Sequence, residues 1–343
     1  MDIVRTNHSL PMSKAVNTHS QGGVDIFTMW WYNYKNAYEI RQGIMKLFAP
    51  EYYKKFNCIA DKCKHSCCIG WEIDIDGKTM DKYAKCNGDY AETVLGSIEA
   101  DNQPHFKLGE NERCPHLNEN GLCNIIIELG EDYLCHICRE HPRFYNDTRR
   151  GREVGLGMAC EEACRIILTS DDYDKICVLG EFAGEGCESE FDAIFHRERL
   201  FGILKNKSLS YAQKLKEIGN EYGLSIDSLS DGLWREVLSE LEYLDASHKE
   251  LFSAFSVDTK PDVAHEKALE RALAYFVYRH CTEAWDMCEF RISLGLCLFC
   301  ERLLASLTAL ENDILCLARI ISEEIEYSED NTESIKNVIF DII

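Results

Sequence analysis

The stretch FNCIADKCKHSCCIGW, residues 56–71, places four cysteines within eleven positions. The whole chain has 343 residues and 18 cysteines, and it is long enough to bury a core without disulfide staples. The cysteines are bunched at short spacings, and the adjacent Cys67 and Cys68 cannot easily bridge each other. These thiols therefore favour metal binding in a reducing compartment over a secreted disulfide scaffold.

Further cysteines extend the pattern as far as Cys160, with one Cys-x2-Cys pair at Cys135 and Cys138. Thiolates are soft ligands that select zinc or iron–sulfur clusters, and each site takes about four. The wide, uneven gaps favour an iron–sulfur cluster, most simply 4Fe-4S, and zinc is the alternative. We predict nine metal ligands: Cys58, Cys63, Cys67, Cys68, Cys114, Cys123, Cys135, Cys138 and Cys160. Cys164, Cys297 and Cys300 are expected to be core residues.

The pattern of residues changes twice along the chain. Residues 1–44 contain no cysteine and are expected to be an N-terminal extension. Residues 45–187 are loop-rich and hold thirteen cysteines, which predicts a cysteine-cluster domain held together by a metal centre. Residues 188–343 show apolar residues near 3.6-residue spacing, which predicts helices. The predicted fold is mainly α, with the cysteine-cluster domain followed by a helical bundle.

The charge of the chain is concentrated in its C-terminal half. Residues 171–343 carry 17 Lys and Arg against 35 Asp and Glu, a net charge of −18. This balance argues against nucleic acid as a partner and suits a basic, lysine-bearing protein, although a solvated helical surface gives the same pattern. The longest apolar run, residues 292–300, is far shorter than the roughly 20 residues of a membrane span. With no export signal visible, we expect a cytoplasmic protein that does not enter membranes.

Four segments resemble the flagellin lysine-N-methylase family, which carries a CxxCxxCC zinc- or iron-chelating signature. They are FNCIADKCKHSCCIGWEIDID (56–76), RCPHLNENGLCNIIIELGEDYLCHICREHPRFYN (113–146), CEEACRIILTSDD (160–172) and LERALAYFVYRHCTEAWD (269–286). The family commonly has Pro where this chain has Glu161. The resemblance implies N-methylation of flagellin lysines, dependence on an iron–sulfur cluster and S-adenosylmethionine as the methyl donor.

Methyl transfer to lysine needs a neutral amine, whereas an unperturbed lysine has a pKa of about 10.4. Polar residues beside the cysteines are candidates for this chemistry. We predict that His141 or Tyr145 contacts the amine, and that Arg139 or Arg143 binds the carboxylate of the donor. No glycine-rich donor loop is visible. The competing hypothesis is therefore a non-catalytic zinc- or iron-binding module for protein interaction.

Overall fold

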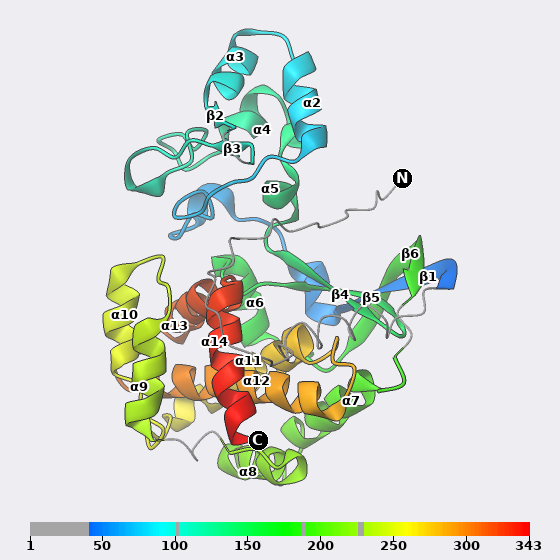
Figure 1. The fold of residues 1–343 in the computed structure, drawn as a ribbon, viewed down its shortest axis with the longest axis vertical. Helices are drawn as coiled ribbons and strands as arrows, with labels where there is room; N and C mark the ends of the chain where they lie inside the picture. The colour runs from blue at the N-terminus through cyan, green and yellow to red at the C-terminus, as the bar shows by residue number, and fades with distance from the viewer. Residues whose placement is uncertain (1–40, 101–102, 187–188, 226–229) are drawn as a thin grey trace, which may run out of the picture.

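The structure is a computed structural model that describes residues 41–100, 103–186, 189–225 and 230–343. Residues 1–40 of the predicted N-terminal extension lie outside the described residues, and residues 41–44 belong to the first strand. Helices dominate the described chain and a small sheet accompanies them, so the mainly α prediction is confirmed (Figure 1). No helix in the described ranges has both the length and the apolar character to cross a membrane.

A bundle of helices forms the larger part of the molecule, called here the helical body. Its centre is α11 (Glu266–His280) and α12 (Met287–Leu307), and most side chains of α12 are buried. On α11, Leu269, Leu273 and Phe276 are all buried, as their spacing predicts. Around these two helices lie α6 (Glu161–Thr169), α7 (Ala193–Leu204), α8 (Tyr211–Tyr222), α9 (Asp231–Glu240), α10 (Ala246–Ser253), α13 (Ile314–Ile321) and α14 (Glu329–Ile342).

The boundaries of these helices follow from local side-chain chemistry. Ser210 caps α8, and its hydroxyl and the side chain of Gln213 form a reciprocal capping box. Gly223 ends the same helix in a left-handed conformation, which glycine adopts without steric cost. A π-helical segment, η7 (Ser322–Glu326), continues directly from α13. Such segments are rare and often occur at functional sites.

A four-stranded sheet lies against the helical body, in the order β4-β5-β1-β6. Its strands are β1 (Arg41–Pro50), β4 (Arg143–Thr148), β5 (Gly151–Leu156) and β6 (Ile176–Gly186). β4 and β5 form an antiparallel hairpin, β1 runs parallel to β5, and β6 pairs antiparallel with β1. Buried residues of β5 and α6 belong to the same hydrophobic core as α11 and α12. The cysteine-rich segment therefore contributes the sheet and α6 to the main core.

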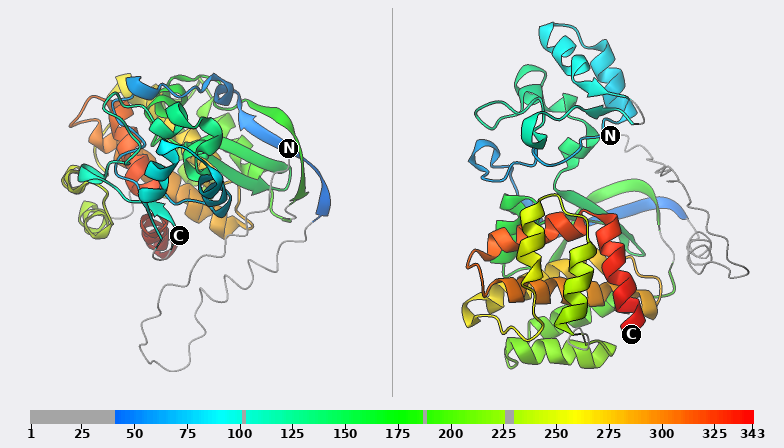
Figure 2. Two further views of the ribbon diagram at one scale, coloured as in Figure 1. Left: turned by 90° about the horizontal axis from the view of Figure 1, so that it is seen from above. Right: turned by 60° about the vertical axis from the view of Figure 1, so that its left-hand side comes forward.

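The rest of that segment forms a separate small lobe, residues 56–141, which stands away from the helical body (Figure 2). It is loop-rich, as predicted, with four short α-helices, three 3-10 helices of three residues each and one two-stranded ribbon among the described residues. The α-helices and the ribbon strands are α2 (Gly77–Lys85), α3 (Asp89–Gly96), α4 (Asn124–Glu128), α5 (His136–Glu140), β2 (Ile98–Glu99) and β3 (His105–Phe106). Its core is small and includes Ile73, Ile75, Tyr83, Val94 and Phe106. Five of the predicted metal ligands pack into or against this core.

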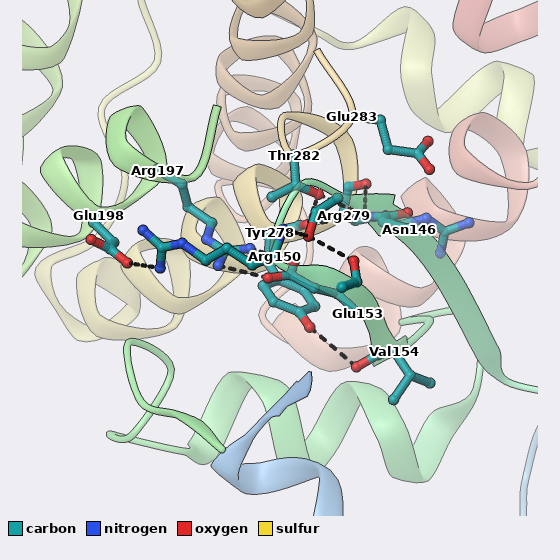
Figure 3. A network of polar contacts seen from close by, with 12 residues as sticks. Asn146, Arg150, Glu153, Val154, Arg197, Glu198, Tyr278, Arg279, Thr282 and Glu283 are labelled. Carbon is teal, nitrogen blue, oxygen red and sulfur yellow. Dashed lines mark hydrogen bonds and ion pairs between the residues drawn. The ribbon is translucent and has the colours of Figure 1, made fainter. Parts of the chain in front are cut away.

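A buried ion pair connects the sheet to α7 (Figure 3). Arg197 donates two hydrogen bonds to the carboxylate of Glu153, at 2.5 and 2.9 Å, and both side chains are almost completely buried. Nearby, the hydroxyl of Tyr278 donates to the Val154 carbonyl at 3.2 Å, and the amide of Asn146 donates to the carbonyl of Arg279. These bonds fix the β4–β5 hairpin against α7 and α11.

Candidate functional site

The nine cysteines predicted as metal ligands fall into two groups. The first lies where the small lobe meets the helical body and is called here the seam thiols: Cys58, Cys63, Cys67 and Cys160. Burial raises the pKa of Cys63 to about 12, and the negative charges of Cys160 and Glu161 add to the increase. The carboxylate of Glu161 accepts hydrogen bonds from the backbone of Lys64 and His65, at 2.8 and 3.2 Å. Glu161 therefore holds the cysteine loop against the start of α6, beside Cys160.

The second group lies in the core of the small lobe and is called here the lobe thiols: Cys68, Cys114, Cys123, Cys135 and Cys138. The sulfur atoms of Cys135 and Cys138 are 3.3 Å apart, at the start of α5. The backbone N–H of Cys114 donates to the carbonyl of Cys68 at 2.8 Å, which joins two separate loops. Three contacts together lower the pKa of Cys68 to about 7: a hydrogen bond with Cys67, a hydrogen bond with Ser66, and the positive charge of Arg113.

The adjacent cysteines of the opening motif therefore join the two groups. Cys67 is hydrogen-bonded to Cys68, which packs with the lobe core, and the charges of Cys160 and Cys58 also act on Cys67. No three His, Cys, Asp or Glu side chains among the described residues lie close enough together to hold a metal ion. The donor set is nevertheless chemically suited to an iron–sulfur cluster, because thiolates are its usual ligands. The iron and sulfide atoms of a cluster also separate its thiolates more widely than a single ion does. The metal centre stays a prediction.

His141, predicted to be catalytic, lies at the end of the small lobe beside Tyr327 of the helical body. The two ring centres are 6.5 Å apart, and the Nε2 atom of His141 is buried with no hydrogen-bond partner. Burial, assisted by the charge of Arg143, lowers the pKa of His141 to about 4. The imidazole is therefore neutral at pH 7 and is a weak base, with one nitrogen free to take part in a hydrogen bond.

Tyr145, the alternative catalytic residue, has different surroundings. It lies on β4 with 45% of its surface exposed, and its hydroxyl donates to the carboxylate of Glu140 at 2.7 Å. Burial of the hydroxyl, with the hydrogen bond to Glu140, raises the pKa of Tyr145. A phenol with a raised pKa is a poor base at neutral pH. Neither residue has a pKa near 7, which suits proton removal best, and of the two only His141 offers a buried nitrogen without a partner.

Arg139 and Arg143, predicted to bind the donor, both contact the protein itself. Arg139 donates to the backbone carbonyls of Asp132 and Leu134, at 3.2 and 2.6 Å. Arg143 donates to the hydroxyl of Tyr53 at 2.9 Å and to the Arg139 carbonyl at 3.3 Å. These contacts connect the small lobe to the chain on either side of it. Donor binding by either arginine stays a prediction.

Tyr327, which sequence reasoning did not single out, is central to the seam. Its ring contacts Trp71 of the small lobe edge-on at 5.5 Å, and the guanidinium of Arg279 lies 4.7 Å from its centre. A Cβ atom at Gly157 would lie 2.1 Å from the Tyr327 hydroxyl, so only glycine fits there. These five residues are called here the Tyr327 cluster: Trp71, His141, Gly157, Arg279 and Tyr327.

A buried polar network supports this cluster from the helical body. Arg279 donates to the Tyr275 hydroxyl at 3.0 Å and to the backbone carbonyl of Glu326 at 3.2 Å. His280 lies 2.7 Å from the Glu326 carboxylate, which also accepts from Tyr275. Both Glu326 and Tyr327 are placed by the π-helical segment η7, and no signal in the sequence indicates such a segment.

The Tyr327 cluster lies next to the seam thiols. The pKa of Tyr327 is raised, mainly by burial. The positive charge of Arg279 works against this increase, whereas the negative charges of Glu326 and Cys160 add to it. Cys160 also follows Gly157 by three residues at the start of α6. The seam thus combines four thiols, three aromatic or imidazole rings and one buried guanidinium.

Comparison with known proteins agrees with the resemblance read from the cysteine segments. A lysine-N-methylase of Salmonella typhimurium strain LT2 is 29% identical over 136 residues, which cover 36% of this chain and 32% of that protein. The corresponding lysine-N-methylase of Salmonella choleraesuis matches to the same extent. The chain is similar to lysine-N-methylases. It spans about a third of the length of these two relatives.

A flagellar protein is also similar to this chain. The flagellar biosynthetic protein FliU of Salmonella muenchen is 28% identical over 165 residues, which cover 45% of this chain and 94% of that protein. No family model matches the chain, and no solved structure matches it.

Proposed function

We propose that the protein is a protein-lysine N-methyltransferase that acts on flagellin lysines, uses S-adenosylmethionine as donor and depends on an iron–sulfur cluster. The names of two relatives support the reaction and the substrate: lysine-N-methylase and flagellar biosynthetic protein. The observation that carries the proposal is the position of the seam thiols directly beside the Tyr327 cluster. A zinc site at the same thiols is the alternative for the metal.

The seam thiols are the residues we assign to the cluster. Cys58 and Cys67 are exposed and Cys63 and Cys160 are half-buried, so a cluster held here is accessible from solvent. If three of these thiolates bind the cluster, its fourth iron would supply an open position able to hold the methionine end of the donor. The lobe thiols lie deeper, with Cys114 and Cys135 buried, and we give them no part in the reaction.

The surroundings of His141 favour a neutral lysine amine. The charge of Arg279 is balanced by the Glu326 carboxylate 3.4 Å away, so burial of the lysine side chain beside Trp71 and Tyr327 is what lowers the pKa of the incoming ammonium. The unpartnered Nε2 of the neutral His141 accepts a hydrogen bond from the amine, and because the pKa of His141 is low the proton itself passes to solvent. The faces of Trp71 and Tyr327 would stabilise the positive charge of the methylated product. Substrate attraction is helped by the acidic C-terminal half, whose net charge is −18.

The proposal is tested by incubating anaerobically purified protein with flagellin and methyl-labelled S-adenosylmethionine. We expect label on flagellin lysines, and we expect His141→Gln to lower kcat/KM by about a hundredfold because the nitrogen that orients the amine is lost. His265→Gln is the matched control, since His265 lies on the surface with its Nε2 3.0 Å from Asn312. A protein that carries iron and sulfide yet transfers no label to any lysine would instead indicate the metal-binding interaction module.

A further inference from the structure

The lobe thiols form a group that the function proposed above does not use. Four of them come from loops outside the opening motif: Cys114, Cys123, Cys135 and Cys138. All four belong to or pack against one small core, which contains few other buried side chains. Small folds with so little apolar core usually depend on disulfides or on a metal. The lobe thiols are free cysteines, so a metal is the remaining means of holding the lobe together.

The sulfur atoms of this group lie within electrostatic range of one another. The negative charge of Cys135 acts on three other thiols: Cys114, Cys123 and Cys138. The charge of Cys68 acts on the same three. The seam thiols interact among themselves in the same way. The nine cysteines therefore form two neighbouring sets rather than one, and each set is large enough for a metal site of four thiolates.

Cys135 and Cys138 have nearly the spacing of two ligands of one zinc ion. Their sulfur atoms are 3.3 Å apart. Two thiolates on a tetrahedral zinc, each at a Zn–S distance of about 2.3 Å, are about 3.8 Å apart. An iron–sulfur cluster binds its thiolates through different iron atoms and therefore holds them farther apart. The pair also has the Cys-x2-Cys spacing that is typical of structural zinc sites, so it fits a single ion better than a cluster.

Cys114 and Cys123 lie at the two ends of one tight loop. The backbone N–H of Asn124 donates to the carbonyl of His116 at 2.8 Å and closes this loop. The backbone N–H of Ile126 lies near the sulfur of Cys123 and favours its thiolate form, and the N–H of His116 does the same for Cys114. Such donors stabilise the negative charge of thiolates that bind a metal. The loop therefore brings together a second pair of thiols that is suited to the same ion.

We propose that the small lobe binds one structural zinc ion, separate from the iron–sulfur cluster at the seam, through Cys114, Cys123, Cys135 and Cys138. Cys68 is not a ligand, because its sulfur is hydrogen-bonded to Cys67 of the seam. Zn²⁺ replaces the four thiol protons, which pass to solvent. No three such side chains of the described residues have the spacing of a single ion, so Cys114 and Cys123 move towards the other pair as zinc binds. Four thiolates leave zinc no open position, so this site stabilises the lobe and has no part in methyl transfer.

The test is metal analysis of the full chain, purified anaerobically from zinc-supplemented medium, together with X-ray absorption at the zinc edge. We expect about one zinc per chain, with four sulfur neighbours at about 2.3 Å. In competition with a chromophoric chelator, Cys123→Ser should bind zinc at least about tenfold more weakly and keep its iron. Cys63→Ser, which removes a seam thiol, should lose iron and keep its zinc affinity. Cys86→Ser is the matched control, since Cys86 is a half-buried lobe cysteine that bonds to Tyr133 instead.

The proposal is overturned if the unmodified chain binds no zinc, or if its zinc has nitrogen or oxygen neighbours. It is also overturned if Cys63→Ser or Cys86→Ser weakens zinc binding as much as Cys123→Ser does. The absorption measurement uses the unmodified chain, so it decides the question even if a variant fails to fold. Neither methyl donor nor flagellin is present. A chain that binds zinc but no iron would contradict the cluster of the proposed methyltransferase and leave the zinc site standing.

Discussion

At the scale of single residues, the environment of a side chain decided its role more than its type did. The sequence places Arg139, His141, Arg143 and Tyr145 close together, and all four were candidates for the reaction. The fold gives both arginines backbone or hydroxyl partners and leaves one nitrogen of His141 buried and unpaired. Those partners are backbone carbonyls beside Cys135 and the hydroxyl of Tyr53, 90 residues before Arg143, and neither kind of partner can be read from residue spacing.

The buried His141 predicts a specific pH dependence of stability. Its pKa is about 4 in the folded chain, below the usual value of about 6.5 in an unfolded one. Between these values the unfolded chain binds more protons, so stability falls as the pH decreases from about 6.5 towards 4. His141→Gln removes this contribution. The difference between the urea midpoints at pH 7.5 and pH 5 should therefore be smaller in this variant than in the parent protein or in His265→Gln. Equal differences in all three would contradict the burial of His141.

At the scale of elements, the helices were easier to predict than the strands. The spacing of Leu269, Leu273 and Phe276 predicted α11. The sheet was missed because β5 is buried almost throughout and therefore shows no alternation of polar and apolar residues. The π-helical segment was also missed, since it depends on how Glu326 and Tyr327 pack against α11.

The β4–β5 hairpin depends on one glycine. Gly151 has φ of +141°, and a Cβ atom there would lie 2.3 Å from the backbone oxygen of Lys46 on the neighbouring strand. Gly130 also has a positive φ, +96°, but has no neighbouring atom within 4 Å of such a Cβ. Gly130→Ala should lower the free energy of unfolding by about 1–2 kcal/mol, because of the backbone conformation alone. Gly151→Ala should lower it by about 1–3 kcal/mol more, because β5 and β1 must move apart to make room for the Cβ atom. Urea denaturation of both variants measures this difference, and equal losses would contradict the close approach of β5 to β1.

At the scale of the whole molecule, the cysteine count predicted that part of the chain would be loop-rich, and the small lobe confirms this. It did not predict that the same segment would supply α6 and nearly all of the four-stranded sheet to the other core. That arrangement depends on long-range packing, for example of Leu156 and Cys164 with residues of α11 and α12. Such contacts cannot be predicted from amino-acid composition or from the local spacing of residues.

Removing metal should affect the two parts of the molecule unequally. The helical body has a large apolar core, whereas the small lobe has few buried apolar residues and a core in which the lobe thiols take a large share. If metal binds these thiols, its removal takes away much of the stability of the lobe. After anaerobic treatment with a chelator, hydrogen exchange should therefore increase across residues 56–141 while α11 and α12 stay protected. A uniform increase, or none, would contradict a metal-stabilised lobe.

The connection between the two parts has an evolutionary consequence. The chain enters the small lobe just after Tyr53 and leaves it at Arg143, and the 2.9 Å bond between these residues holds the entry and the exit side by side. The lobe is thus an inserted module whose two ends meet at one point on its host. Genetic recombination can exchange such an insert without cutting any other element of the fold. The small lobe and the rest of the protein can therefore have separate evolutionary origins.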